Sequence, residues 1–399
     1  MESLKEILNN NGINFLPPEE ILNRIDKLKF LLQKKEILEA VIFSKVNNYY
    51  FTGTNQEQIL IVYASKPPLL LVKRDIHRAS LESPIETVNF SSFQDLKKFI
   101  SSKNIGVEFN YITAKQYLKL KSFLSDNLID ITNIIREIRS IKSNFELKLM
   151  KKAASIAEKV YIEALNYLKE GITEIEFGSI MFSLAQKFGH EGVLRTGSID
   201  FNPVSWHILS GISGNIHGQY DAPASGIGMS PSFPNSASRK KILKGEPVMV
   251  DFGICYYGYQ VDSTRMYCIG EPDEKFQSFY NSARKIEKHI LTKVKIDATG
   301  DFLYNEAIKE AKAIGVFNEF LGIGKNKKKF IGHGVGLETS ESPLLAKNSK
   351  DKISERMTFA IEPKFVINNF GIVGIENSVV VLNNKIEKIT KISEDILIV

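Results

Sequence analysis

Two aspartates, Asp251 and Asp262, lie in apolar, strand-like segments on either side of a short turn at 256–258. The turn is centred between them, so a hairpin is expected to place them roughly opposite each other, with Cβ atoms about 4.5–5.5 Å apart. Two bare carboxylates at that separation repel, so a positive charge must lie between them or one must hold a proton. The spacing therefore indicates a site that binds a cation or shares a proton.

Two glutamates further along the chain have the same arrangement. Glu362 and Glu376 flank an Asn-Asn-Phe-Gly turn at 368–371, and each stands among apolar residues. Asn369, inside that turn, is the midpoint between them, so a second pair of opposed acids is expected. Between the two hairpins, His333 is flanked by glycines in a strand-like run. The sequence thus offers four strand carboxylates and one imidazole.

This donor set suits hard or borderline divalent cations, of which we favour Mn²⁺, with Co²⁺, Zn²⁺ and Fe²⁺ as alternatives. Two ions would balance four carboxylates and can share a bridging hydroxide. Any one of these residues, taken alone, is more often a structural acid or a core histidine. The joint arrangement predicts a two-metal site made of Asp251, Asp262, His333, Glu362 and Glu376.

The elements that must position this site fall into two parts. The first third alternates a helical pattern at 21–34 with apolar, strand-like runs at 40–43, 59–63, 69–72 and 104–109, which is typical of an α/β domain. It carries no glycine-rich nucleotide-binding loop. Residues 131–141 are expected to bridge to the second part.

In the second part, capping boxes at 143–146 and 173–176 predict two consecutive helices, the first running to about Glu170 and ending at Gly171. A long loop rich in glycine, serine and proline is expected at 211–238. Strands should dominate from Pro247 onward, interrupted by helices at 275–293 and 302–314.

Composition is that of an ordinary globular protein. The 399 residues are 43% hydrophobic and 25% charged, and the net charge of +6 gives no reason to expect a nucleic-acid partner. The lysine-rich run at 325–329 is expected to be a solvated loop. No apolar stretch is long enough for a membrane span, and residues 1–6 lack a signal-peptide pattern, so we expect a cytoplasmic protein without membrane contact. Cys255 and Cys268 do not form a CxxC pair and are expected to be small buried side chains.

At these residues the chain resembles the creatinase/methionine aminopeptidase family, which has the pita-bread fold, and it is most similar to the Xaa-Pro peptidase branch. The matching stretches are D-x-G at 251–253, D-x-T-R at 262–265, G-H-G-x-G-L at 332–337, E-P at 362–363 and I-E at 375–376. The lead-in R-x-I-K-S-x-x-E is at 139–146, and 50–53 resembles the Y-L-T-G of the N-terminal domain. The resemblance implies an α/β N-terminal domain at 1–140 and an α+β pita-bread catalytic domain at 141–399.

The resemblance also implies a role for each ligand. Asp251 would bind one metal ion, and His333 and Glu362 would bind the other. Asp262 and Glu376 would bridge the two. Glu362 would also act as general base or acid toward the attacking water, a proton transfer within reach of a carboxylate beside a metal-bound hydroxide.

The chain departs from the family pattern at several positions. The peptidase members have a second histidine seven residues after the ligand histidine, and here that position is Ser340. An upstream histidine of the family is expected to be His217, a catalytic candidate, with His207 as a weaker one, or the role is empty. Some aminopeptidases have an arginine just before the last ligand, where this chain has Gly374.

The resemblance implies metal-dependent hydrolysis of small peptides with proline in the second position, as in Xaa-Pro dipeptidases or aminopeptidases, with activity that is weak or altered because of Ser340. It also implies a homodimer. Two alternatives remain open: a non-catalytic family member that acts as a binding module, and an amidinohydrolase like creatinase, which works without metal. The intact five-ligand set favours the metallopeptidase over both.

Overall fold

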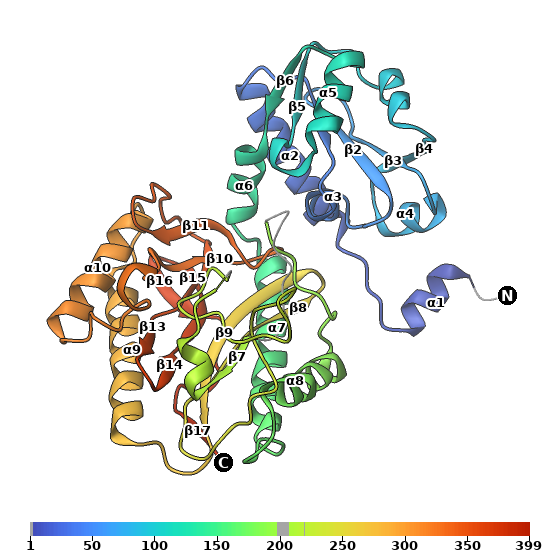
Figure 1. Ribbon diagram of the computed structural model, residues 1–399. Helices are drawn as coiled ribbons and strands as arrows, with labels where there is room; N and C mark the ends of the chain where they lie inside the picture. Colours follow the sequence, from blue (N-terminus) through green and yellow to red (C-terminus); the bar gives the residue numbers. More distant parts are fainter. Residues whose placement is uncertain (1–2, 198–206, 219) are drawn as a thin grey trace. The chain divides into compact units, whose positions relative to one another are not determined.

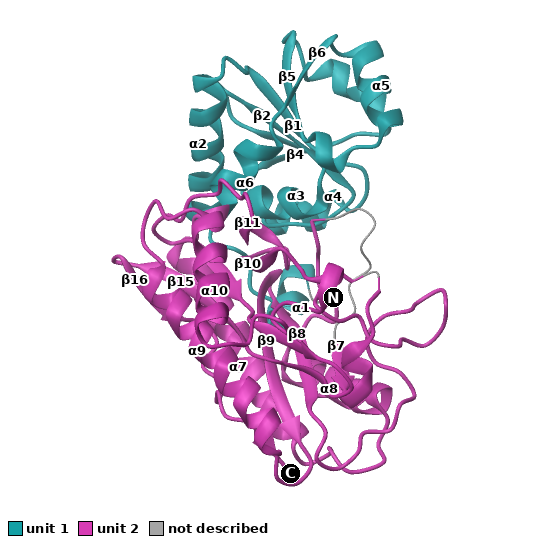
Figure 2. Ribbon diagram, turned by 60° about the vertical axis from the view of Figure 1, so that its left-hand side comes forward, with its two compact units in different colours: residues 1–139 teal, residues 140–399 magenta. Residues whose placement is uncertain are grey.

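The computed structural model describes residues 3–197, 207–218 and 220–399, which divide into two compact units (Figure 2). Unit 1 is Met1–Arg139 and unit 2 is Ser140–Val399, so the division lies one residue before the boundary expected from the sequence. Among the residues described, no helix combines the length and the apolar character needed to cross a membrane.

Unit 1 is built on a six-stranded sheet. Its strands are β1 (Glu39–Ile42), β2 (Gln58–Tyr63), β3 (Leu69–Val72), β4 (Glu86–Asn89), β5 (Asn104–Val107) and β6 (Asn127–Asp130). Its helices are α1 (Leu4–Asn10), α2 (Pro18–Lys34), α3 (Lys45–Thr52), α4 (Ile76–Glu82) and α5 (Ala114–Phe123), with short turns η1 (Phe93–Lys98) and η2 (Phe109–Tyr111). The order β4-β3-β2-β1-β5-β6 mixes parallel and antiparallel pairs, and this is the α/β domain that the alternating pattern predicted.

Helix α6 (Thr132–Ser140) runs across the division between the units by one residue, and a larger sheet forms the centre of unit 2. The helices of unit 2 are α7 (Asn144–Ala164), α8 (Glu174–Phe188), α9 (Glu274–Lys293) and α10 (Gly300–Ala313), with turns η3 (Gly211–Asn215) and η4 (Gly324–Asn326). Its strands are β7 (His207–Ser210), β8 (Val248–Tyr256), β9 (Tyr259–Cys268), β10 (Phe330–Gly334), β11 (Glu341–Ala346), β12 (Thr358–Ile361), β13 (Lys364–Ile367), β14 (Gly371–Gly374), β15 (Glu376–Leu382), β16 (Lys385–Lys388) and β17 (Leu397–Ile398).

The sheet of unit 2 lies between two pairs of helices (Figure 1). Its main path is β11-β10-β12-β15-β9-β8-β7, and β13 pairs with β14 in a separate two-stranded ribbon. Helix α7 packs on β8 and β9, whereas α9 contacts β13 and β14 and α10 contacts β10 and β11. Cys255 and Cys268 are unpaired and buried within this layer, as the sequence predicted. Enclosure of the sheet between the helix pairs is the pita-bread arrangement expected from the resemblance.

Both predicted capping boxes are present in front of α7 and α8. The first helix is shorter than predicted, because α7 ends at Ala164 and not near Glu170. The amides of residues 165–167 bond to carbonyls three residues back, so the chain tightens out of the α-helix there. Gly171 still turns the chain, with φ of 86° and its amide donating to the carbonyl of Ile242.

The hairpin of β8 and β9 has a register different from the one its sequence suggested. The turn residues Tyr257 and Gly258 both have positive φ, 50° and 77°, as a two-residue type I′ turn requires. This turn lies one position later than the expected centre, so Asp251 pairs with Thr264 and not with Asp262. Direct opposition of the two aspartates was therefore wrong. They are diagonal neighbours on the same face, which still brings them close.

Arg265 on β9 is a fully buried cation whose five N–H groups all donate to hydrogen bonds. Its Nη1 donates to the carbonyls of Thr264 and Glu376, each at 2.8 Å. Its Nη2 and Nε donate to Asn377 Oδ1 and to the carbonyls of residues 392 and 393, at 2.7–3.0 Å. One guanidinium thus ties β9, β15 and the C-terminal segment together directly behind the glutamate at the start of β15.

We expect Arg265→Lys to lower the free energy of unfolding by roughly 2–4 kcal/mol, because an ammonium cannot reach all of these buried acceptors. Urea unfolding followed by circular dichroism measures the loss. Arg284→Lys is the matched control, since Arg284 forms a partly exposed ion pair with Asp395. Equal unfolding midpoints for Arg265→Lys and the control would contradict the importance of this network.

Candidate metal centre

A row of polar side chains crosses the middle of the sheet in unit 2. The register pairs His207 on β7 with Asp251 on β8, Asp251 with Thr264 on β9, and Thr264 with Glu376 on β15. The Thr264 hydroxyl donates to Glu376 Oε2 at 2.8 Å. Residues far apart in the sequence are therefore held side by side by backbone pairing alone.

Glu362 extends this row on the other side of Glu376. It lies between β12 and β13, and β12 pairs with β15 in the same register as β13 with β14. Glu362 is therefore directly opposite Glu376, as the spacing of the second hairpin predicted. Both side chains are buried.

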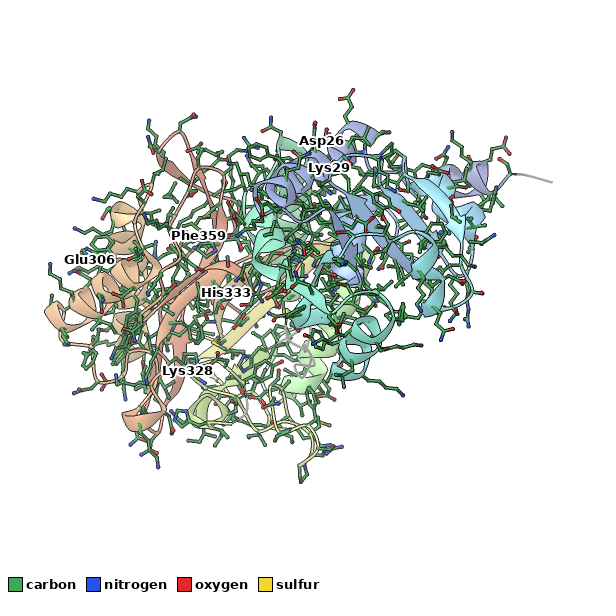
Figure 3. The ribbon with its side chains drawn as sticks, turned by 90° about the horizontal axis from the view of Figure 1, so that it is seen from above. Asp26, Lys29, Glu306, Lys328, His333 and Phe359 are labelled. Carbon is green, nitrogen blue, oxygen red and sulfur yellow. The ribbon has the colours of Figure 1, made fainter. Side chains whose placement is uncertain are left out.

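Asp262 and His333 complete the group. Ligand atoms of Asp262, His333 and Glu376 all lie within 4.8 Å of one another. His333 Nε2 is also 3.4 Å from Glu362 Oε1. Figure 3 shows His333 inside unit 2, away from the outer helix that carries Glu306. Two carboxylates and an imidazole at this separation are a suitable ligand set for a divalent ion.

Lys364, which sequence analysis did not include in the site, lies among these acids. Its Nζ donates to Asp251 Oδ2 at 2.7 Å, to Glu362 Oε2 at 2.8 Å and to Glu376 Oε2 at 3.2 Å. A signal for it was present, because residues two apart on a strand share a face and Lys364 follows Glu362 by two. The positive charge that opposed carboxylates require is thus supplied partly by the chain itself.

The electrostatics show that one ammonium does not neutralise the cluster. Burial, together with the nearby Asp251 carboxylate, raises the pKa of Asp262 to about 7. Burial also raises the pKa of Glu376 well above its ordinary value, although Lys364 opposes the rise. Burial would raise the pKa of Asp251 too, but Lys364 and His207 outweigh it and hold that pKa below its usual range. Asp262 and Glu376 are therefore the acids that most need a further cation.

The two histidines proposed for the upstream role lie in different surroundings. His207 is buried, with its Nδ1 4.0 Å from Asp251 Oδ2 and its ring stacked on Tyr220 at 5.1 Å. Burial lowers the pKa of His207 to about 4, so its imidazole is neutral at pH 7. His217 and Ser340 are both exposed. His207, the weaker candidate from the sequence, is therefore the histidine that lies beside a proposed ligand, Asp251.

Comparison with known proteins covers both units. The model of metallopeptidase family M24 matches residues 148–383, and that of the creatinase/prolidase N-terminal domain matches residues 24–141. The Xaa-Pro dipeptidase of Pyrococcus furiosus is 26% identical over 382 residues, which are 94% of this chain and 99% of the relative.

Solved structures resemble the chain over a similar extent. The prolidase of Pyrococcus horikoshii has a TM-score of 0.79 at 25% identity, covering 93% of this chain and 99% of its own. The Xaa-Pro dipeptidase of Bacillus anthracis has a TM-score of 0.81 at 24% identity and shares the fold over 95% of this chain and 100% of its own. Because the M24 model matches more than half of its length, the chain belongs to metallopeptidase family M24.

Proposed function

We propose that this metallopeptidase hydrolyses small peptides with proline in the second position, as a dipeptidase or an aminopeptidase. The observation that carries the proposal is the convergence of the sequence-predicted ligands on neighbouring strands of unit 2, with Asp262, His333 and Glu376 closest together. The Xaa-Pro dipeptidase of P. furiosus, which aligns over almost its entire length, supports the substrate class.

A divalent ion held by these residues would supply Lewis acidity toward the peptide carbonyl and the attacking water. Glu362 is placed to accept the proton of that water. Its Oε2 is fixed by Lys364 at 2.8 Å, and its Oε1 lies 3.4 Å from His333 Nε2, beside the ligand group. Thr264 fixes Glu376 in the same way through its hydroxyl. Mn²⁺ remains the ion we favour, with Co²⁺, Zn²⁺ and Fe²⁺ as alternatives.

Ser340 favours weak or altered peptidase activity, because an exposed serine stands where the peptidase members have a histidine. A serine hydroxyl carries no proton that titrates near neutral pH and reaches less far than an imidazole. His217, on the exposed part of the 211–238 loop, is proposed to compensate in part.

Loss of activity altogether would make the chain a binding module, the second candidate function. The cytoplasmic location inferred from the sequence stays a prediction.

The loop at 211–238 also supports the proposed homodimer. Three of its large apolar side chains, Ile212, Ile216 and Ile227, are each more than 40% exposed. Long loops in compact domains are more often functional than idle. We therefore propose that this loop meets the partner chain.

Light scattering is expected to give twice the mass of one chain. Combined Ile216→Asp and Ile227→Asp substitutions should shift the protein to monomer, because a charge cannot be buried in an apolar contact without a partner. Leu118→Asp, on an exposed residue of unit 1, is the control and should leave the mass unchanged. A monomeric unmodified chain at working concentration would remove the dimer proposal.

Asp262→Asn is expected to abolish most of the divalent metal content, since it removes one charged ligand while keeping the side-chain size. Elemental analysis after loading with Mn²⁺ and desalting measures the effect. Asp221→Asn, at a carboxylate that is 83% exposed, is the matched control. If both variants retained the metal content of the unmodified chain, Asp262 would not be a ligand.

Hydrolysis of an Xaa-Pro dipeptide in Mn²⁺ is expected to be slow, and His217→Ala should lower kcat further, by roughly 10²-fold if His217 stabilises the oxyanion. Steady-state kinetics, with an Xaa-Ala dipeptide as substrate control, gives these values. His289→Ala is the matched variant, since His289 pairs with Glu306 on the outer helices. Fast turnover that is insensitive to both His217→Ala and Ser340→Ala would show that the oxyanion donor lies elsewhere.

A further inference from the structure

The ammonium of Lys364 lies at a point shared by three of the five expected ligands. An ammonium has three N–H donors, and here the three acceptors are carboxylate oxygens of Asp251, Glu362 and Glu376. The side chain is 1% exposed, so water does not compete for these donors. The donor capacity of the lysine is fully used inside the acid cluster.

In the two-metal arrangement that the resemblance implies, the ion held by Asp251 would also be held by Glu376, and both of these carboxylates bond to Lys364 Nζ. Metal-to-carboxylate distances are about 2.0–2.2 Å, so an ion bound to both of these oxygens would crowd Nζ, which lies 2.7 Å from Asp251 Oδ2 and 3.2 Å from Glu376 Oε2. The five-residue set therefore does not fit two metal ions while Lys364 keeps this position.

The backbone around Lys364 is shaped to hold its side chain there. Lys364 is the first residue of β13 and pairs with Gly374 on β14. A Cβ at Gly374 would lie 2.5 Å from Lys364 Cγ and 2.8 Å from the carbonyl oxygen of Pro363, closer than real side chains approach, so both the lysine side chain and the close approach of the backbone require glycine here. The carbonyl of Lys364 also accepts from the amide of Leu321 at 2.9 Å. Lys364 on β13 and Gly374 on β14 are therefore matched across the two-stranded ribbon.

We propose that the ammonium of Lys364 takes the place of one metal ion, so that each chain binds a single divalent ion, at Asp262, His333 and Glu376. Glu376 serves both cations: Lys364 and Thr264 both donate to Oε2, so Oε1 is the oxygen that we assign to the ion. With one ammonium and one divalent ion, the four carboxylates keep a single net negative charge. A second divalent ion would instead make the centre net positive. This inference rests on the proposed metal dependence of the chain.

The test is the number of Mn²⁺ ions bound per chain, measured by isothermal titration and by elemental analysis on the full chain after removal of metal. The unmodified chain is expected to bind one ion. Lys364→Ala vacates the position and is expected to bind two. Lys151→Ala, which removes a lysine paired at the surface with Glu387, is the matched control and should bind one. Two ions in the unmodified chain, or one in Lys364→Ala, would overturn the inference.

Lys364→Ala leaves three carboxylates, those of Asp251, Glu362 and Glu376, without their ammonium, so its folding is checked by circular dichroism in Mn²⁺. If it does not fold, the count in the unmodified chain decides alone: one ion supports the inference and any other number overturns it. One ion without Xaa-Pro turnover would refute the proposed peptidase activity and leave the inference standing. Two ions with turnover would overturn the inference and leave the proposed peptidase activity standing. No bound ion would refute both.

Discussion

Four carboxylates can be buried side by side only if positive charge lies among them, because an isolated ion loses several kcal/mol of hydration in a protein interior. This constraint governs the centre of unit 2. Lys364 meets it in part, through ion pairs with Asp251, Glu362 and Glu376 at 2.7–3.2 Å. The negative charge that Lys364 does not neutralise lies at Asp262 and its neighbours. A divalent ion is best accommodated there.

Backbone pairing and a few side chains are enough to place these acids in the sheet. Antiparallel pairing alone brings residues from β7, β8, β9 and β15 into one lateral row. Thr264 fixes one glutamate from the side, and Arg265 holds the backbone of the same glutamate from behind. Helices α7 to α10 each contact strands of unit 2, so the apolar packing comes from residues outside the polar row. The backbone register thus determines where the residues of the row lie, and a small number of side chains determine the charge at the centre.

Hydrophobic periodicity, capping boxes and turn residues are local signals, and they predicted the α/β character of unit 1, the helices α2, α7, α8, α9 and α10, and the opposition of Glu362 and Glu376. The pita-bread fold of unit 2 came from the resemblance, and the metal-binding role of the five residues stays a prediction. The sequence placed the turn between β8 and β9 one position too early. Tyr257 has a positive φ, a conformation that asparagine or glycine would have indicated but tyrosine does not. The sequence also missed Lys364: the face that it shares with Glu362 was a local signal, but its pairing with Asp251, on a strand distant in the sequence, was not. The likeness to the Xaa-Pro dipeptidase of P. furiosus covers 94% of this chain, yet the number of cations that we propose for the centre follows from Lys364 of this chain.

The most direct test of this account is a crystal structure of the Mn²⁺-loaded protein with data at the manganese absorption edge. The account predicts one anomalous peak per chain, about 2.0–2.2 Å from ligand atoms of Asp262, His333 and Glu376, with Lys364 Nζ still bonded to Asp251 and Glu362. Two peaks bridged by Asp262 and Glu376, with the Lys364 side chain turned away, would contradict it.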